Sequence, residues 1–271
     1  MTLRTSIPGR GATAALVMLL APGVAFGDQK APTPPVDGET RFNNGLEHLR
    51  AGRLDMALEE FQAAVKQDPK NPYFFKGLGV AHSQLADRCP AKDQGCRQRN
   101  LDEAVLAARK ALELNPYYAD ARNDLGTFLI RSGKREEGKK EFLAAFNDPT
   151  NPSPEFSASN LGQACFEEKN YTQAINWFQT SLGKSKTHPL GHLGLADTLV
   201  AMGKLDDAIV QLEAGAKALP EDWDIALSLG DAYYRAGRFG EARTRLELVA
   251  GKDPSGSAGR RAAVLLKKFP K

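Results

Sequence analysis

Three cysteines are the side chains in this sequence best suited to covalent chemistry. Cys89 and Cys96 bracket the segment CPAKDQGC, in which Pro90 and Gly95 bend the chain. Two cysteines that flank a short loop favour a disulfide in an oxidising compartment. A metal or redox pair is the alternative, but the spacing is not C-x-x-C and the sequence holds no second pair. Cys165 is then left as a buried, inert thiol.

Four histidines are the next candidates, because imidazole is a common ligand for zinc: His48, His82, His188 and His192. His188 and His192 lie four residues apart, a spacing that places two ligands on one face of a helix. However, His188 precedes Pro189, which we expect to open a helix, and no third ligand accompanies the pair. We therefore interpret them as ordinary histidines at a helix start and predict no metal site.

Catalytic signatures are missing from the sequence. It contains no Gly-rich phosphate loop, no nucleophile elbow and no paired-carboxylate motif. We therefore predict a non-enzymatic protein with no catalytic residues and no cofactor. The alternative is an enzyme whose active site carries no recognisable motif. A pocket with converging carboxylates would indicate such an enzyme.

Composition describes a folded chain without a bias toward nucleic acid. The 271 residues are 42% hydrophobic, which is enough to bury a substantial core. The net charge is +3, but Arg4 and Arg10 belong to a predicted leader, and without them acidic and basic side chains nearly balance. Such a chain has no general electrostatic attraction for nucleic acid or for an anionic membrane.

Residues 1–27 have the features of a secretory signal peptide. A basic start is followed by a short apolar core at residues 12–20 (ATAALVMLL). Ala25-Phe26-Gly27 then supplies the small-x-small pattern that predicts cleavage after Gly27. We therefore expect an exported, periplasmic protein. No cysteine lies in the leader, so we predict no direct lipid anchor.

The mature chain is expected to start at Asp28. An uncleaved N-terminal anchor is the alternative, although the apolar run is short for a bilayer and Pro22 interrupts it. Residues 28–37 (DQKAPTPPVD) are rich in proline and lack apolar periodicity. They predict an extended linker between the leader and the folded part.

The elements that must position these side chains repeat along the rest of the chain. Small residues recur at intervals near 34: Gly45, Gly79, Gly126, Gly162, Ala196 and Gly230. A second ladder of small residues keeps the same intervals: Ala57, Ala104, Gly138, Ala174, Ala208 and Ala242. Such paired ladders are typical of the tetratricopeptide repeat, a 34-residue helical hairpin whose two helices pack closely at small residues.

The sequence therefore predicts an all-α fold, a right-handed superhelical solenoid of about six tetratricopeptide hairpins over residues 38–256. The predicted repeats occupy residues 38–71, 72–118, 119–152, 155–188, 189–222 and 223–256. The second repeat carries 13 extra residues between its helices. We expect them to form a long loop, which the disulfide would pin.

Glycines at two kinds of position refine this prediction. Gly52, Gly133, Gly203 and Gly237 mark the turns between paired helices, where glycine adopts positive φ without strain. Gly138 lies inside a helix, where we expect glycine to cost about 0.5–1 kcal/mol relative to alanine.

Residues 257–271 are expected to form a capping helix and tail. Val264, Leu265 and Phe269 would cover the sixth repeat. The basic residues of this segment would meet water: Arg260, Arg261, Lys267 and Lys268.

Function in such a solenoid is expected on the concave surface lined by the first helix of each repeat. Aromatic side chains there would anchor a peptide or amphipathic helix, and amides would pair with its backbone. The predicted partner-binding groove comprises Tyr73, Asn123, Thr127, Phe156, Asn160, Gln163, Phe166 and Tyr234. Asp197, Val200, Leu227 and Asp231 are expected to face the same surface. The alternative is that several of these side chains pack against the next repeat.

The third and fourth repeats carry more specific motifs. Asn123 to Leu129 reads NDLGTFL, Asp148 to Pro154 reads DPTNPSP, and Asn160 to Cys165 reads NLGQAC. This combination resembles the type IV pilus biogenesis and stability family, tetratricopeptide pilotins that help the outer-membrane secretin to assemble. The resemblance covers residues 112–250, whereas the first two repeats match only as generic repeats.

The resemblance implies a protein partner such as an outer-membrane secretin or a pilus assembly protein. Members of the family are commonly lipoproteins, and several carry a second cysteine where this chain has Ile130. The resemblance therefore implies a periplasmic form that reaches the outer membrane through its partner, with Cys165 unpaired. An adaptor for another envelope system, such as polysaccharide export or outer-membrane assembly, is the alternative function.

Overall fold

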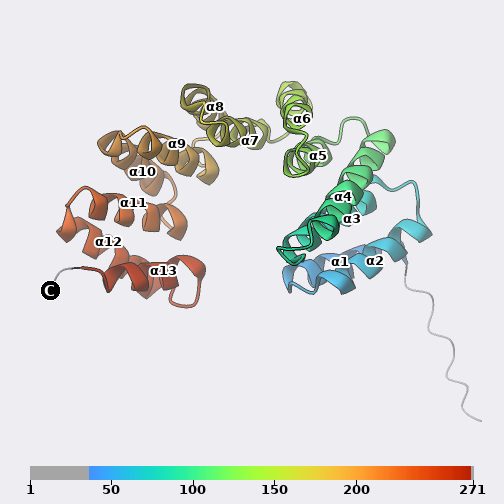
Figure 1. Ribbon diagram of the computed structural model, residues 1–271, viewed down its shortest axis with the longest axis horizontal. Coiled ribbons are helices and arrows are strands. Elements are labelled where there is room, and N and C mark those ends of the chain that lie inside the picture. The colour runs from blue at the N-terminus through green and yellow to red at the C-terminus, as the bar shows by residue number, and fades with distance from the viewer. Residues whose placement is uncertain (1–36, 270–271) are drawn as a thin grey trace, which may run out of the picture. The chain divides into compact units, whose positions relative to one another are not determined.

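The computed structural model describes residues 37–269, and within that range every regular element is an α-helix. The predicted signal peptide, residues 28–36 of the predicted linker, and residues 270 and 271 lie outside the described residues. No helix between residues 37 and 269 combines the length and the apolar character that crossing a bilayer requires. The helices are α1 (Gly38–Arg50), α2 (Leu54–Gln67), α3 (Pro72–Arg88), α4 (Gln94–Leu114), α5 (Ala119–Arg131), α6 (Arg135–Asn147), α7 (Pro154–Glu167), α8 (Tyr171–Lys184), α9 (Pro189–Ala201), α10 (Leu205–Ala218), α11 (Trp223–Arg235), α12 (Phe239–Lys252) and α13 (Ser257–Leu266) (Figure 1).

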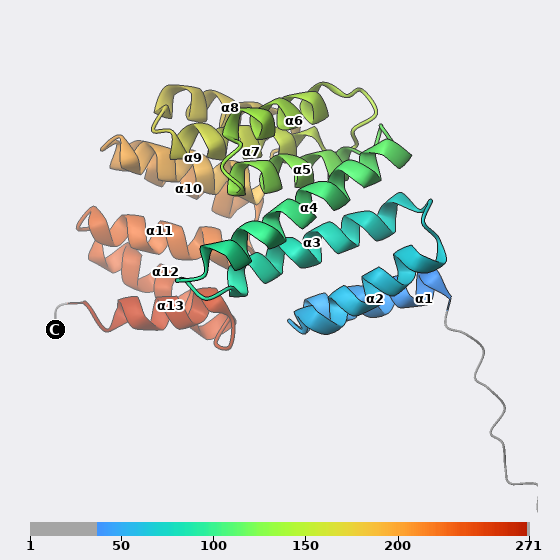
Figure 2. The same ribbon diagram turned by 45° about the vertical axis from the view of Figure 1, so that its right-hand side comes forward.

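The helices pair as hairpins that follow one another in chain order (Figures 1 and 2). Each odd-numbered helix also contacts the next odd-numbered helix, from α1 with α3 to α11 with α13. Among the described residues, no even-numbered helix contacts the next even-numbered one. The odd-numbered helices therefore share one face, which we call the inner face. This arrangement confirms the predicted all-α solenoid of six hairpins with a capping helix.

The two ladders of small residues meet where the helices of a hairpin cross. A Cβ atom at Gly126 would lie 2.6 Å from the ring of Phe142, which is 2% exposed. A Cβ atom at Gly138 would lie 2.5 Å from the carbonyl oxygen of Gly126. The backbones of α5 and α6 therefore touch at these two residues. This close approach explains why glycine occupies position 138. The loss of stability expected from its low helix propensity does not take this contact into account.

The turns inside the hairpins have the backbone conformation that the sequence predicts. Gly52, Gly133, Gly203 and Gly237 have φ values of 69°, 87°, 76° and 74°. In the fourth repeat Lys169 takes the equivalent place with φ of 60°. A residue with a Cβ atom is strained in this region. The turn between α7 and α8 is therefore the least favourable of the set.

The second hairpin corrects one expectation. The 13 extra residues do not form a long loop, because α3 extends to Arg88 and α4 begins at Gln94. The turn added to α3 carries the buried residue Ala86, whereas residues 94–100, added at the start of α4, are half-buried or exposed. The side chain of Asp93 accepts a hydrogen bond from the Cys96 N–H at 2.8 Å and caps α4. A bond between Cys89 and Cys96 joins the two helix ends, with Cα atoms 5.8 Å apart.

The capping helix α13 packs on α11 and α12. Leu265, Leu266 and Phe269 contact the apolar cluster that includes Ala226 and Leu246. Val264 differs from the expectation that it would cover the sixth repeat, since 57% of its surface is exposed. Successive helical residues are about 100° apart, so Val264 lies on another side of the helix than the buried Ala262.

Candidate functional site

A cavity of about 230 Å³ opens on the inner face between α5 and α7. Three residues of the predicted binding groove line it, which are Thr127, Asn160 and Gln163. Thr127 and Gln163 occupy the ninth position of successive repeats, so the helical stacking brings them to the same place. We call this site the central groove, lined by Thr127, Ile130, Arg131, Phe142, Asn160, Gln163, Ala164 and Glu167.

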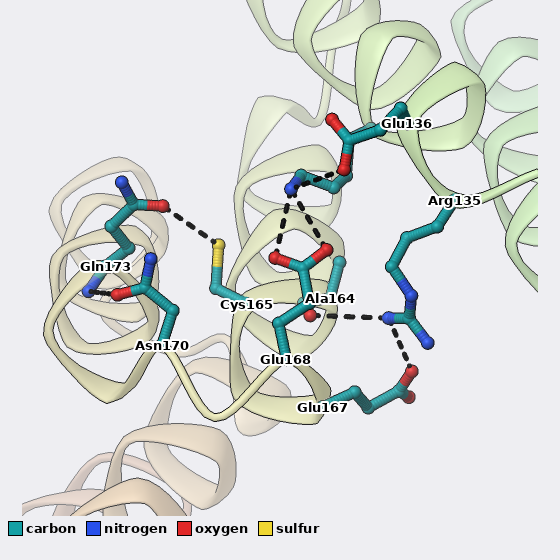
Figure 3. A network of polar contacts seen from close by, with 9 residues as sticks. Arg135, Glu136, Ala164, Cys165, Glu167, Glu168, Asn170 and Gln173 are labelled. Atoms are coloured by element: carbon teal, nitrogen blue, oxygen red, sulfur yellow. Dashed lines mark hydrogen bonds and ion pairs between the residues drawn. The ribbon is translucent and has the colours of Figure 1, made fainter.

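Hydrogen bonds brace the rim of the central groove. Gln163 donates from Nε2 to Glu167 Oε1 at 3.3 Å. Arg135, at the start of α6, donates from Nη1 to Glu167 Oε2 at 3.0 Å and to the Ala164 carbonyl oxygen at 3.4 Å (Figure 3). On the other side, Arg131 donates to Ser83 Oγ at 2.5 Å. The rim side chains are therefore held across neighbouring hairpins.

The aromatic members of the predicted groove do not line this cavity. Phe156 is 47% exposed, and its ring makes a T-shaped contact with the His188 ring at a centroid distance of 4.6 Å. Phe166 packs against Tyr171 and against the buried cluster around Cys165. Phe166 therefore packs between helices, as the alternative supposes, although its ring contact, Tyr171, belongs to its own hairpin and not to the next repeat.

The remaining predicted groove residues, on α3, α5 and α11, do not line the central groove either. Tyr73 is 53% exposed and contacts the ring of Tyr118 at 5.0 Å. Tyr234 packs against Phe269 at 4.9 Å, which makes it part of the cap. Asn123 on α5 has a buried Oδ1 atom that lacks a hydrogen-bond partner within residues 37–269. That oxygen does not face a solvent-filled groove.

A buried carboxyl group stands beside Asn123. Asp124 lies 3.8 Å from Lys76 Nζ, and Asp120 lies 4.0 Å from the same atom. Burial raises the pKa of Asp124 to about 6, although the charge of Lys76 counteracts part of this effect. Burial and the two carboxylates also raise the pKa of the Tyr118 hydroxyl above its ordinary value. This cluster is a charged neighbour of the central groove.

The two closely spaced histidines are engaged in packing. His188 forms a hydrogen bond from Nε2 to Ser159 Oγ at 3.0 Å, and burial lowers the pKa of its imidazole. His192 forms one hydrogen bond to the Lys186 carbonyl oxygen at 2.9 Å and another with Gln211 at 2.6 Å. Within residues 37–269, no group of three His, Cys, Asp or Glu side chains could hold a metal ion.

Cys165 lies on the buried side of α7. Its thiol is 3.7 Å from Gln173 Oε1, to which it donates (Figure 3). Burial raises the pKa of the Cys165 thiol, and the nearby Lys139 opposes this effect. The thiol is therefore held in its neutral, less reactive form.

A larger cavity, of about 640 Å³, opens on the inner face between α9, α11 and α13. We call it the C-terminal cavity. Its polar lining is Asp197, Ser228, Asp231, Arg235, Ser257, Arg260, Arg261 and Lys268. Its apolar lining is Ala196, Val200, Leu212, Leu227, Ala232, Val264 and Leu265.

Sequence reasoning missed the part of this cavity that α13 contributes. Arg260, Arg261 and Lys268 are exposed, as expected, but the sequence did not predict that they also line a cavity. The repeat register could have indicated this cavity. Asp197 and Asp231 occupy the ninth repeat position, which Thr127 and Gln163 occupy in the central groove. Extending that register into α13 would have placed Leu265 at the same position.

Two carboxylates in one pocket are also the feature expected of an enzyme whose active site carries no recognisable sequence motif. Asp231, however, forms an ion pair with Arg235, in which Nε lies 2.8 Å from the carboxylate. Burial raises the pKa of Asp197, and Arg235 opposes this effect. One of the two carboxylates, Asp231, is therefore paired with a cation.

Known families match this helical architecture. One family model described as "Tetratricopeptide repeat" matches residues 42–85 and 193–257, and a second with the same description matches residues 95–219. The chain is a tetratricopeptide repeat protein. Proteins of this class are generally non-enzymatic scaffolds that present extended surfaces to partners.

Curated relatives share the repeats at low identity. This tetratricopeptide repeat protein is 28% identical over 195 residues to the type IV pilus assembly protein PilF of Pseudomonas aeruginosa, covering 69% of this chain and 72% of that one. It is 22% identical over 228 residues to the protein CTR9 homolog of Arabidopsis thaliana, covering 82% of this chain. The chain spans only 20% of the length of that second relative.

Solved structures share the fold. PilW, titled a widely conserved type IV pilus biogenesis factor, superposes with a TM-score of 0.59 at 21% identity, over 83% of this chain and 98% of that one. Pseudomonas aeruginosa PilF superposes with a TM-score of 0.59 at 20% identity, over 84% and 97% of the two chains. At these identities the likeness concerns the fold alone.

Proposed function

We propose that this tetratricopeptide repeat protein is an exported, periplasmic scaffold that binds a protein partner and promotes assembly of an outer-membrane secretin in type IV pilus biogenesis. The observation that carries the proposal is that Thr127 and Asn160, from two of the motifs that resemble the pilus family, line one cavity. The 28% identity to PilF over most of both chains supports the same assignment.

The central groove would bind an extended segment of the partner. Asn160 and Gln163 carry amide groups that both donate and accept hydrogen bonds, which suits the backbone of a bound strand or peptide. Arg135 and Glu167 hold the rim in place, so little ordering of side chains would oppose binding. Phe156, which is exposed on the same helix, would supply an apolar contact nearby.

Export and localisation are part of the proposal. The leader would be removed after Gly27, and the protein would reach the outer membrane through its partner, since no leader cysteine is present to carry a lipid. N-terminal sequencing of protein from the periplasmic fraction should find Asp28 as the first residue. An intact Met1 on membrane-bound protein would contradict this part.

The test of the function is affinity purification from envelope fractions with an antibody against the protein. We expect a secretin in the eluate of the wild-type strain. The variant Asn160→Ala/Gln163→Ala should recover at least tenfold less, because each lost hydrogen bond to a desolvated partner costs about 1–3 kcal/mol. A secretin that is never recovered would reject the secretin assignment and leave an adaptor for another envelope system as the function.

The matched control is Asn147→Ala/Gln179→Ala. It removes the same two residue types from exposed positions on α6 and α8, away from the inner face. It should recover as much secretin as the wild type. Equal losses in both variants would mean that the central groove is not the binding site. Phe166→Ala is unsuitable for this purpose, because its ring packs between helices and its loss should lower the melting temperature.

A further inference from the structure

The C-terminal cavity carries an excess of positive charge. Four basic and two acidic side chains line it. Arg235 is paired with Asp231 at 2.8 Å, and Arg260 donates to the backbone carbonyl oxygen of Ser255. Within residues 37–269, the side chains of Arg261 and Lys268 take part in no ion pair. Their charges are therefore available to a ligand.

The cavity also has an apolar surface beside these charges. Leu227 is buried in its wall, and Val200 and Leu265 are half-buried. Val264 is 57% exposed although it lies on the inner face of α13. An exposed valine beside the unpaired Arg261 and Lys268 is a surface that a ligand with both apolar and acidic groups would cover.

The size of the site limits the range of possible ligands further. About 640 Å³ falls in the usual range for sites that enclose a ligand, and it accommodates several side chains. Three successive inner-face helices line the site, so a chain that lies along the solenoid could contact all three. An extended chain fits this shape better than a compact small molecule does.

We propose that the C-terminal cavity binds an acidic segment of a partner polypeptide. Carboxylates of the segment would face Arg260, Arg261 and Lys268, and an apolar side chain would cover Val264. Asp197 favours a polypeptide over a lipid headgroup or a nucleic acid, because its oxygens can accept backbone N–H groups, which a phosphate backbone lacks. This site goes beyond the proposed secretin function and does not depend on it.

The test uses residues 28–271 and a fluorescein-labelled peptide, GSEELFEEDGS, followed by fluorescence anisotropy. We expect saturable binding that weakens as salt rises, since the charges are exposed. The variant Arg260→Gln/Arg261→Gln should weaken binding at least tenfold. Val264→Gln should also weaken it, and its melting temperature should stay near that of the wild type because the side chain is exposed.

The control variant is Lys66→Gln/Lys217→Gln. It removes the same net charge from exposed positions on α2 and α10, and we expect it to bind the peptide within twofold of the wild type. A control peptide with glutamine in place of glutamate and asparagine in place of aspartate should bind at least tenfold more weakly than the acidic peptide.

Three results would overturn the proposal. The first is an acidic peptide that does not bind, or that binds no more tightly than its amide counterpart. The second is an equal loss of binding in the Arg260→Gln/Arg261→Gln variant and its charge control. The third is tighter binding of phosphatidylglycerol vesicles or oligothymidine than of the peptide, lost in the same variant. None of these outcomes depends on secretin recovery, so the two proposals can fail separately.

Discussion

The central groove and the C-terminal cavity are built from the same repeat positions, yet their volumes are about 230 and 640 Å³. Position nine holds Gln163 in the first and Asp231 in the second. Position six holds Asn160 in one and Ser228 in the other. Shorter side chains on an equivalent backbone therefore leave more room in the C-terminal cavity.

Charge differs between the two sites as well as size. Position 13 holds Glu167 beside the central groove, where Arg135 from the preceding helix, α6, neutralises it at 3.0 Å. The same position holds Arg235 in the C-terminal cavity, and α13 adds further cations. A repeat framework thus fixes where ligands can bind, whereas a few side chains at fixed positions decide what they are.

Close packing behind the central groove gives a large expected effect on stability. Gly138→Ala should destabilise the protein by about 1–3 kcal/mol, because the new Cβ would lie 2.5 Å from the Gly126 carbonyl oxygen. Differential scanning calorimetry should show a melting temperature several degrees lower. Gly183→Ala is the control, since nothing lies within 4 Å of its Cβ position, and it should stabilise α8 by about 0.5–1 kcal/mol. Stabilisation by both substitutions would mean that the helices behind the groove are loosely packed.

Removing the covalent link in the second hairpin tests whether the C-terminal cavity is independent of distant repeats. Cys89→Ser/Cys96→Ser should lower the free energy of unfolding by about 2–3 kcal/mol and leave the protein folded. Peptide binding at the C-terminal cavity should not change, because repeats couple mainly to their neighbours. Thiol counting on unreduced, denatured mature wild-type protein should find one free thiol, on Cys165. Three free thiols would reject the disulfide.

Near the central groove, the carboxyl group of Asp124 should make the stability of the protein depend on pH. The pKa of Asp124 is about 6 in the folded protein, above its ordinary value of 3.8. The folded state therefore keeps a proton that the unfolded state releases, and stability should fall as pH rises from about 4 to 6. Asp124→Asn should remove this fall, a gain of roughly 1–2 kcal/mol at pH 7 once partial exposure is considered.

Urea unfolding at several pH values between 4 and 7 measures this effect. The control Asp120→Asn removes a carboxylate beside the same Lys76, but from a side chain that is 61% exposed. It should change stability at pH 7 by less than about 0.5 kcal/mol. A pH profile for Asp124→Asn that coincides with the wild-type profile would show that this carboxyl is not buried as described.

The smallest expected effect compares the turns behind the two sites. Lys169 has φ of 60° in the turn between α7 and α8, whereas Gly237 occupies the equivalent turn between α11 and α12. Lys169→Gly should stabilise the protein by about 0.5–1 kcal/mol, and Gly237→Lys should destabilise it by a similar amount. Opposite shifts in the urea midpoint would support the equivalence of the two turns. Shifts of the same sign would contradict it.

Much of the fold was predictable because small residues must recur wherever two helices touch. The ladders through Gly126 and Gly138 located the hairpins, and the turn glycines have the positive φ that their positions require. The ends of the second hairpin were not predictable from those ladders. Extra residues that continue a helical pattern can lengthen helices or form a loop, and only packing of residues such as Ala86 selects between them.

The candidate sites were predictable only in part. Repeat register was sufficient to bring Thr127, Asn160 and Gln163 together. It did not separate Phe156, which is half exposed, from Phe166, which packs between helices, because both are aromatic residues expected on the inner face.

The sequence by itself determined the repeat class, the register of the hairpins and some of the side chains that approach the inner face, because these follow from local periodicity. Only the tertiary structure decided the depth of each cavity and the role of α13 in lining one of them. Cavity depth depends on how far side chains from three helices reach into a shared space. Their reach is fixed by contacts such as that between Arg135 and Glu167, which join different hairpins and leave no periodic trace in the sequence.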